Sequence, residues 1–306
     1  MQNRFASHHR SRTAAAVLTV LPVIAMAALT GCDAGQDGTT KGAAAAKHRS
    51  SAVHAPVWDR SPESVAAVGD SITRGFDACS VLTDCPEVSW ATGTDSEVRS
   101  LAVRLLGTSR AAARSWNHAE TGARIAQLPE QMALAAQQKP DLVTVMIGAN
   151  DACRDSAEMM TPVADFRASF KASMRQLRSR APKTQVYVSS VPDLKRLWST
   201  GRGNPLGKQI WKLGICRSML GEADDMSAAA VARRASVQKR VVAYNKVLRD
   251  VCAKDLRCRY DGGAVFGYRF TGKQLSQWDW FHPGRNGQAR LAEIAYRNVT
   301  ARKPPA

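Results

Sequence analysis

Short apolar runs alternate with longer amphipathic segments along this chain, and that alternation restricts the folds it can adopt. The clearest run is LVTVMI at residues 142–147, which is continuous, contains β-branched residues and ends at a glycine. Such runs are typical of strands that are buried on both faces of a sheet. Strands are predicted at residues 64–69, 113–119, 142–147, 185–191 and 257–261, and helices at residues 96–106, 124–138, 162–180, 229–253 and 287–300.

This order of elements predicts an α/β fold with three layers, α/β/α. Strands that alternate with helices form a parallel sheet that carries helices on both faces. We therefore expect a flavodoxin-like architecture with about five mostly parallel strands, and functional residues at the carboxyl ends of the strands. The chain has 306 residues, 44% of them hydrophobic, which suffices for one large domain or two small ones.

The alternation breaks at residues 192–226. A long irregular segment inside a compact domain is usually functional. We expect this insertion to be a loop that covers the substrate and is held by Cys216, and a solvated excursion clipped by a disulfide is the alternative. Glycine, proline and large apolar residues are interspersed there, at Trp198, Gly201, Gly203, Pro205, Gly207, Trp211, Leu213 and Met219.

Residues 1–31 have the features of a secretory signal peptide. Three arginines precede an uncharged apolar stretch at residues 14–29, which is too short to span a membrane comfortably. The sequence LTGC that follows, ending at Cys32, resembles the bacterial lipobox, in which cleavage precedes the cysteine and its sulfur receives a diacylglyceryl group. An ordinary signal peptide with a chance cysteine is the alternative.

The lipobox resemblance implies an exported, extracytoplasmic protein that is anchored by lipid on Cys32 to the bacterial cell membrane, or released to the medium. Two acyl chains anchor firmly because each buried CH₂ contributes about 0.8 kcal/mol. Residues 32–57 contain almost no large apolar side chain, so they are predicted to be a flexible tether. A folded domain at residues 58–306 would follow it.

Six cysteines remain once Cys32 is set aside, an even number in an oxidising context. Six cysteines permit 15 connectivities, and the sequence does not choose among them. Nearest-neighbour pairing is our expectation. No pair has C-x-x-C spacing and no H-E-x-x-H occurs, so we expect no metal. The expected disulfides are Cys79–Cys85, Cys153–Cys216 and Cys252–Cys258.

The chain is strongly basic, with a formal charge of +17 from 43 Lys and Arg against 26 Asp and Glu. Such a charge favours anionic surroundings, such as lipid headgroups, cell-wall polymers or nucleic acid. Export and the lack of a nucleic-acid motif favour a solvated face or anionic lipid, and we expect no nucleic-acid partner. The basic residues that raise the nucleic-acid alternative are Arg233, Arg234, Lys239 and Arg240.

Histidine is scarce, which narrows the search for a catalytic base. Of six histidines, only His118 and His282 fall in the predicted domain. His282 has Asp279 three residues upstream, a spacing that can place a carboxylate on the imidazole in a turn. His118 has only Glu120 nearby, so we favour His282 as the base.

Ser71 is the candidate nucleophile. It follows the first predicted strand directly through Gly69 and Asp70, at the edge where a parallel sheet exposes functional side chains. Gly69 would permit a tight turn there. The tripeptide alone is a weak signal, since it occurs by chance in chains of this length.

Four sequence blocks in order resemble those of the SGNH hydrolases, also called GDSL esterases and lipases. The resemblance covers residues 64 to about 300, and the match around residues 89–93 and 127–131 looks most like the phospholipase B and bacterial secreted lipase branch. It implies a three-layer α/β/α fold and hydrolysis of carboxylic esters without a cofactor. The blocks are Gly69-Asp70-Ser71, Gly122 within NHAETG, Gly148-Ala149-Asn150-Asp151 and Asp279-x-x-His282.

The resemblance also implies a role for each matching residue. Ser71 would be the nucleophile, His282 the general base and then acid, and Asp279 the carboxylate that orients it. The oxyanion hole would consist of the Ser71 and Gly122 backbone N–H groups and the Asn150 side-chain amide. The two remaining motif carboxylates, Asp70 and Asp151, are interpreted as turn-stabilising residues.

The sequence leaves the substrate open. Our leading hypothesis is that a monomer cleaves lipid or other acyl esters through an acyl-enzyme at Ser71. Acetylated glycans are an alternative substrate, and a catalytically silent lipoprotein that binds cell-wall glycan or lipid is an alternative function. The tryptophans that would line an acyl groove, stack on sugars or belong to the core are Trp90, Trp198, Trp211, Trp278 and Trp280.

Overall fold

The computed structural model of the chain describes residues 57–305. The predicted signal peptide, the predicted lipidation site at Cys32 and nearly all of the predicted tether lie outside the described residues. Within residues 57–305, no helix is both long enough and apolar enough to cross a membrane.

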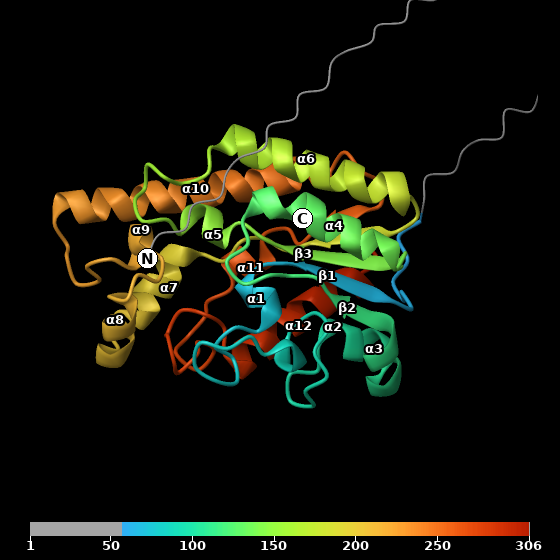
Figure 1. The fold of residues 1–306 in the computed structure, drawn as a ribbon, viewed down its shortest axis with the longest axis horizontal. Coiled ribbons are helices and arrows are strands. Elements are labelled where there is room, and N and C mark those ends of the chain that lie inside the picture. Colours follow the sequence, from blue (N-terminus) through green and yellow to red (C-terminus); the bar gives the residue numbers. More distant parts are fainter. Residues whose placement is uncertain (1–56, 306) are drawn as a thin grey trace, which may run out of the picture. The chain divides into compact units, whose positions relative to one another are not determined.

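A five-stranded, fully parallel sheet forms the centre of the domain, in the order β2-β1-β3-β4-β5 (Figure 1). The predicted sheet is thus confirmed. The central pair β1 and β3 is in register, with Val65 opposite Leu142, and both strands are buried throughout. The strands are β1 (Val65–Gly69), β2 (Ser115–Asn117), β3 (Leu142–Met146), β4 (Gln185–Val188) and β5 (Cys258–Tyr260).

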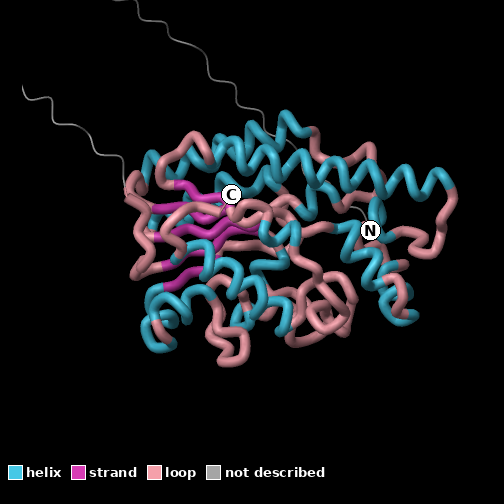
Figure 2. Tube along the Cα trace, turned by 180° about the vertical axis from the view of Figure 1, so that it is seen from behind, coloured by secondary structure: helices cyan, strands magenta, loops and turns pink. Residues whose placement is uncertain are grey.

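Helices cover both faces of the sheet, which confirms the three-layer prediction (Figures 1 and 2). The long apolar side chains of the strands are therefore enclosed on both sides. One face carries α4 (Leu128–Gln137), α6 (Val163–Arg180) and α10 (Ala228–Cys252), and the other carries α2 (Leu101–Leu106), α3 (Thr108–Arg114) and α12 (Arg285–Thr300).

Two predicted boundaries near the second strand are wrong. The helix expected at residues 96–106 begins only at Leu101, because the Ser100 side chain accepts a hydrogen bond from the Val103 N–H and caps it there. Gly107, with φ +77°, separates it from α3, which occupies residues that were assigned to the start of the strand. The strand is consequently reduced to residues 115–117.

The insertion at residues 192–226 contains three helices, so the prediction that it is an irregular loop is wrong. Asp193 and Asn204 cap two of its helices with their side chains, and Pro205 occupies the first position of the second. These capping residues favour short helices despite the scattered glycines. The helices are α7 (Leu194–Gly201), α8 (Pro205–Trp211) and α9 (Arg217–Leu220).

The insertion packs firmly against the rest of the domain. Trp198 and Trp211 are buried, and the guanidinium groups of Arg202 and Arg234 pack on the Trp198 ring, at 4.8 and 4.3 Å from its centroid. Its last helix is tied to the short helix α5 (Ala149–Ala152) by a disulfide at Cys216. The three disulfides follow nearest-neighbour pairing and are Cys79–Cys85, Cys153–Cys216 and Cys252–Cys258.

Candidate active site

Strand β1 delivers Ser71 to the carboxyl edge of the sheet, at the first residue of α1 (Ser71–Arg74). Gly69 makes this possible: its φ is +150°, and a Cβ there would lie 2.2 Å from the carbonyl oxygen of Met146 on β3. Asp70 then caps α1, since its Oδ1 accepts the Ile72 N–H at 3.0 Å. Any side chain at position 69 would push β1 away from β3.

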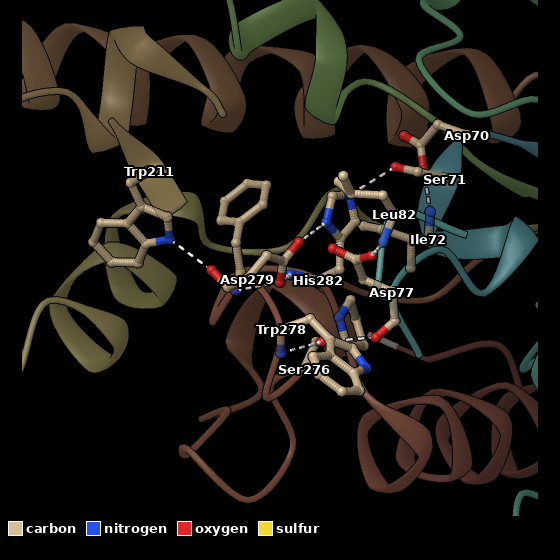
Figure 3. A network of polar contacts seen from close by, with 12 residues as sticks. Asp70, Ser71, Ile72, Asp77, Leu82, Trp211, Ser276, Trp278, Asp279 and His282 are labelled. Carbon is tan, nitrogen blue, oxygen red and sulfur yellow. Dashed lines mark hydrogen bonds and ion pairs between the residues drawn. The ribbon is translucent and has the colours of Figure 1, made fainter. Parts of the chain in front are cut away.

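Ser71, His282 and Asp279 form a continuous chain of hydrogen bonds, although Ser71 and His282 are 211 positions apart in sequence. Ser71 Oγ lies 2.9 Å from His282 Nε2, and His282 Nδ1 is hydrogen bonded to Asp279 Oδ2 (Figure 3). Because the Nδ1 atom donates to a carboxylate, Nε2 of the neutral ring is free to accept the serine proton.

The Asp279 carboxylate is held rigidly in this orientation. Its Oδ1 accepts the backbone N–H groups of Phe281 and His282, each at 2.9 Å. These bonds close a turn, so a carboxylate three residues before His282 can reach the imidazole. Its backbone carbonyl accepts the indole N–H of Trp211 at 2.7 Å, so the insertion supports the catalytic turn (Figure 3).

Two aromatic rings pack against His282. The rings of Phe76 and Phe281 meet the imidazole edge to face, with centroid distances of 5.1 and 5.3 Å. Asp279 is fully buried and Ser71 is 6% exposed. In such surroundings the interaction between imidazolium and carboxylate is stronger than in water.

Burial and charge act in opposite directions on the catalytic pair. Burial lowers the pKa of His282, but the Asp279 charge and hydrogen bond outweigh it and leave that pKa raised. Burial raises the pKa of Asp279, but the charge of His282 outweighs burial and holds that pKa below its usual value. Both shifts stabilise the imidazolium that forms when His282 takes a proton.

Two of the three predicted oxyanion donors, Gly122 and Asn150, lie in the segments that follow β2 and β3, the two neighbours of β1. Gly122 has φ +81°, and no heavy atom lies within 4 Å of where its Cβ would stand, so the space beside it is open. Asn150 is the second residue of α5, which Gly148 precedes. Its Nδ2 donates to the Ala123 carbonyl at 3.0 Å. The structure thus joins the Asn150 amide to the segment that carries Gly122.

The other motif residues have structural contacts. Asp151 Oδ2 accepts the Ile125 N–H at 2.9 Å, and so connects the loop after β3 to the start of the segment before α4. His118 follows β2, and burial lowers its pKa. In the part of the chain that the structure describes, no hydrogen bond links His118 to Ser71.

Two buried glutamines and a third carboxylate were missed at the sequence level. Gln131 on α4 clamps the strand end: its side-chain oxygen accepts the Gly69 N–H at 2.8 Å and its amide donates to the Gly69 carbonyl at 3.0 Å. Gln288 on α12 joins the Trp90 N–H and the Ile72 carbonyl in the same way. Asp77 lies against Asp279 and His282 (Figure 3). The contacts of the two glutamines had one sequence indication, a polar residue on the buried face of a predicted helix.

The side chains near the site do not indicate a metal centre. Ligand atoms of Asp77, Asp279 and His282 lie within 4.8 Å of one another, but Nδ1 and Oδ2 of the catalytic pair are already hydrogen bonded together. A second group contains Cys79 and Cys85, whose sulfurs are joined in a disulfide and are not thiolates.

Of the five tryptophans considered for a substrate groove, three belong to the core. Trp90, Trp198 and Trp211 are 0–6% exposed, whereas Trp278 is 36% exposed. Trp278 lies in the turn that carries Asp279 (Figure 3). It is therefore the tryptophan with the most accessible ring close to the catalytic residues.

Residues 67–290 match the model of the GDSL-like lipase/acylhydrolase family, which is most of the chain. The search of curated proteins found no match to this chain. Several solved structures resemble the chain, all at low identity. A GDSL-like lipase from Parabacteroides merdae, described as putative, is 16% identical, with a TM-score of 0.49, over 81% of this chain and 100% of that one.

Two further structures show the range of enzymes among these neighbours. An extracellular lipase from Streptomyces rimosus is 18% identical, with a TM-score of 0.41, over 78% of this chain and 99% of the other. A family 3 carbohydrate esterase from Clostridium thermocellum is 14% identical, with a TM-score of 0.44, over 76% and 93%.

Proposed function

Because the chain belongs to the GDSL-like lipase/acylhydrolase family and is a carboxylic ester hydrolase, we propose that it cleaves acyl esters through a covalent intermediate on Ser71. The observation that carries this proposal is the 2.9 Å contact between Ser71 Oγ and His282 Nε2, with Asp279 bonded to the far side of the ring. A serine hydroxyl becomes a competent nucleophile when a base so placed removes its proton.

The reaction proceeds in two halves. Ser71 Oγ attacks the ester carbonyl carbon while its proton passes to His282 Nε2, and the oxyanion accepts hydrogen bonds from the Ser71 and Gly122 N–H groups and the Asn150 amide. The C–O bond to the alcohol then breaks, and His282 returns the proton to the leaving oxygen. Water repeats the sequence on the acyl-enzyme, releasing the acid and restoring Ser71.

We propose lipid esters, or other esters with long acyl chains, as the substrate class. The disulfide-closed loop that follows α1 carries two exposed apolar side chains at its tip, Val81 and Leu82, which are 50% and 70% exposed. An apolar tip close to the catalytic residues suits an acyl chain or a lipid surface. The predicted lipid on Cys32 and the basic charge point to the same surroundings.

Hydrolysis of aryl esters with acyl chains from acetyl to palmitoyl tests the mechanism and the substrate class together. Ser71→Ala should abolish turnover, Asn150→Ala should lower kcat by about 10²- to 10³-fold, and Ser80→Ala, at an exposed serine of the neighbouring loop, should leave it unchanged. Rates should rise with chain length.

Two outcomes would overturn parts of this proposal. Equal rates for the wild type and Ser71→Ala would exclude the nucleophile. A rate maximum at acetyl would replace lipid esters by acetylated glycans as the substrate class, while leaving the mechanism intact.

A further inference from the structure

A second buried carboxyl, Asp77, lies beside the catalytic pair. Its side-chain oxygen belongs to a group of three ligand atoms, with those of Asp279 and His282, that all lie within 4.8 Å of one another (Figure 3). Asp77 is 1% exposed. Asp77 takes no part in the proposed reaction steps. Burying a carboxylate without a cation beside it costs free energy.

The position of Asp77 is fixed from several sides. Its backbone has φ +55°, a left-handed conformation that is rare for residues with a side chain. Its N–H donates to the Thr83 carbonyl at 3.0 Å, and its own carbonyl accepts the Ser276 hydroxyl at 2.6 Å. Its Oδ1 accepts the Leu82 N–H. These bonds connect the disulfide-closed loop at residues 77–85 to the turn that carries the catalytic acid.

No cation compensates Asp77 directly. Among residues 57–305, no lysine or arginine forms an ion pair with it. A cavity of about 410 Å³ on this side also contains Lys273 and Arg285, and Arg285 pairs with Asp95 at 3.2 Å. The nearest opposite charge on Asp77 is therefore a protonated His282.

These surroundings raise the pKa of the Asp77 carboxyl. Burial, and then the charge of Asp279, raise the pKa of Asp77 to about 6. Asp70 also acts on His282 by its charge, and burial raises the pKa of Asp70 to about 7. The imidazole thus faces three carboxyls, from the ends of β1 and α1 and from its own turn.

We propose that Asp77 is a positioning residue of this hydrolase, whose carboxyl holds the loop at residues 77–85 and supplies a second, titratable charge that stabilises protonated His282. The proposal rests on the assignment of His282 as the base. As an ionised group, Asp77 supports the imidazolium that forms during acyl transfer. As a protonated group, it donates to Asp279 and removes that support.

The substitution Asp77→Asn separates charge from shape, because the amide oxygen can still accept the Leu82 N–H. Without the second negative charge, the pKa of His282 should fall. The acid limb of the pH profile of kcat/KM should therefore move to lower pH, by roughly 0.5 to 1 unit, and kcat at pH 8 should fall by about three- to tenfold. KM should change little.

Asp261→Asn provides the matched control. Asp261 is also a buried aspartate with a raised pKa, but it lies at the end of β5, where it accepts the Ser190 hydroxyl at 2.7 Å and takes no part in the shift of His282. Its substitution should leave the pH profile where it is. A profile of Asp77→Asn that coincides with that of the wild type would overturn the proposal.

Failure of this proposal can be distinguished from failure of the proposed function. If Ser71→Ala remains active, the catalytic assignment is wrong; if Ser71→Ala is inactive and Asp77→Asn is unshifted, only the role of Asp77 is wrong. Should Asp77→Asn not fold, the His282 ring protons can be titrated by nuclear magnetic resonance in Asp70→Asn. A step near pH 6, besides that of the ring itself, is expected, and a single step would refute the role of Asp77.

Discussion

The two carboxyl oxygens of Asp70 have opposite surroundings. Its Oδ1 caps α1 and so fixes Ser71, while its Oδ2 is buried without a hydrogen-bond partner. Because burial raises the pKa of Asp70 to about 7, the folded protein holds a proton there that the unfolded chain releases near pH 4. Stability contributed by this site is therefore lost as the pH rises from about 4 to about 7.

Asp70→Asn should accordingly stabilise the protein, and more strongly at pH 8 than at pH 5. The amide oxygen can still cap α1, and the energetic penalty of ionising the buried carboxyl, on the order of 4 kcal/mol at pH 8, disappears. Thermal unfolding of the wild type and variant at both pH values measures this. Equal differences in Tm at the two pH values would contradict the assigned pKa.

At the scale of elements, the strands were easier to predict than the helical insertion. The runs at residues 64–69 and 142–147 are apolar on both faces, and only a covered parallel sheet buries them completely. In the insertion, the signals are single capping residues such as Asp193 and Asn204, which compete with nearby glycines. Periodicity does not resolve helices of four to eight residues.

The residues of the candidate active site could be selected from the sequence for a related reason. Ser71 and His282 each adjoin an element that the sequence indicates, and the scarcity of histidine left few alternatives. The contacts of Asp77 with Ser276, of Gln131 with Gly69 and of Gln288 with Ile72 cross 62 to 216 residues of sequence and exist only once the layers have packed. No local pattern encodes such contacts.

The two disulfides of unequal span near the site should differ in their effect on stability. Cys153–Cys216 closes 63 residues and Cys79–Cys85 closes 6. Loop entropy then assigns about 4 kcal/mol to the first and about 2 kcal/mol to the second. Paired Cys→Ser substitutions, followed by thermal unfolding, should show the larger loss of Tm for the first pair, and the reverse order would exclude the entropic account.

At the scale of the whole molecule, the charge and the N-terminal sequence suggest where the enzyme works. The predicted signal peptide contributes three of the 43 basic residues, so nearly all of the positive charge belongs to the remainder of the chain. A basic protein near an anionic leaflet is attracted to it over about one Debye length, roughly 8 Å at physiological salt. We propose that lipid on Cys32 supplies the stable attachment.

Cys32→Ser tests that attachment in a bacterial host that processes lipoproteins. The wild type should sediment with membranes, whereas the variant should be found mainly in soluble fractions, because the proposed lipid attachment needs the Cys32 sulfur. Immunoblots of the fractions measure the distribution, and esterase activity per molecule should be equal in both. An unchanged distribution would leave the cysteine without this role.

The hydrogen bond from Trp211 to the Asp279 carbonyl has a practical consequence. It makes the catalytic turn depend on a segment that the Cys153–Cys216 disulfide closes. Protein produced in a reducing cytoplasm would have Ser71, His282 and Asp279 but lack the closure that holds their support. Such preparations should have low specific activity that oxidative refolding restores, so the redox history of a sample must be known before its rates are compared.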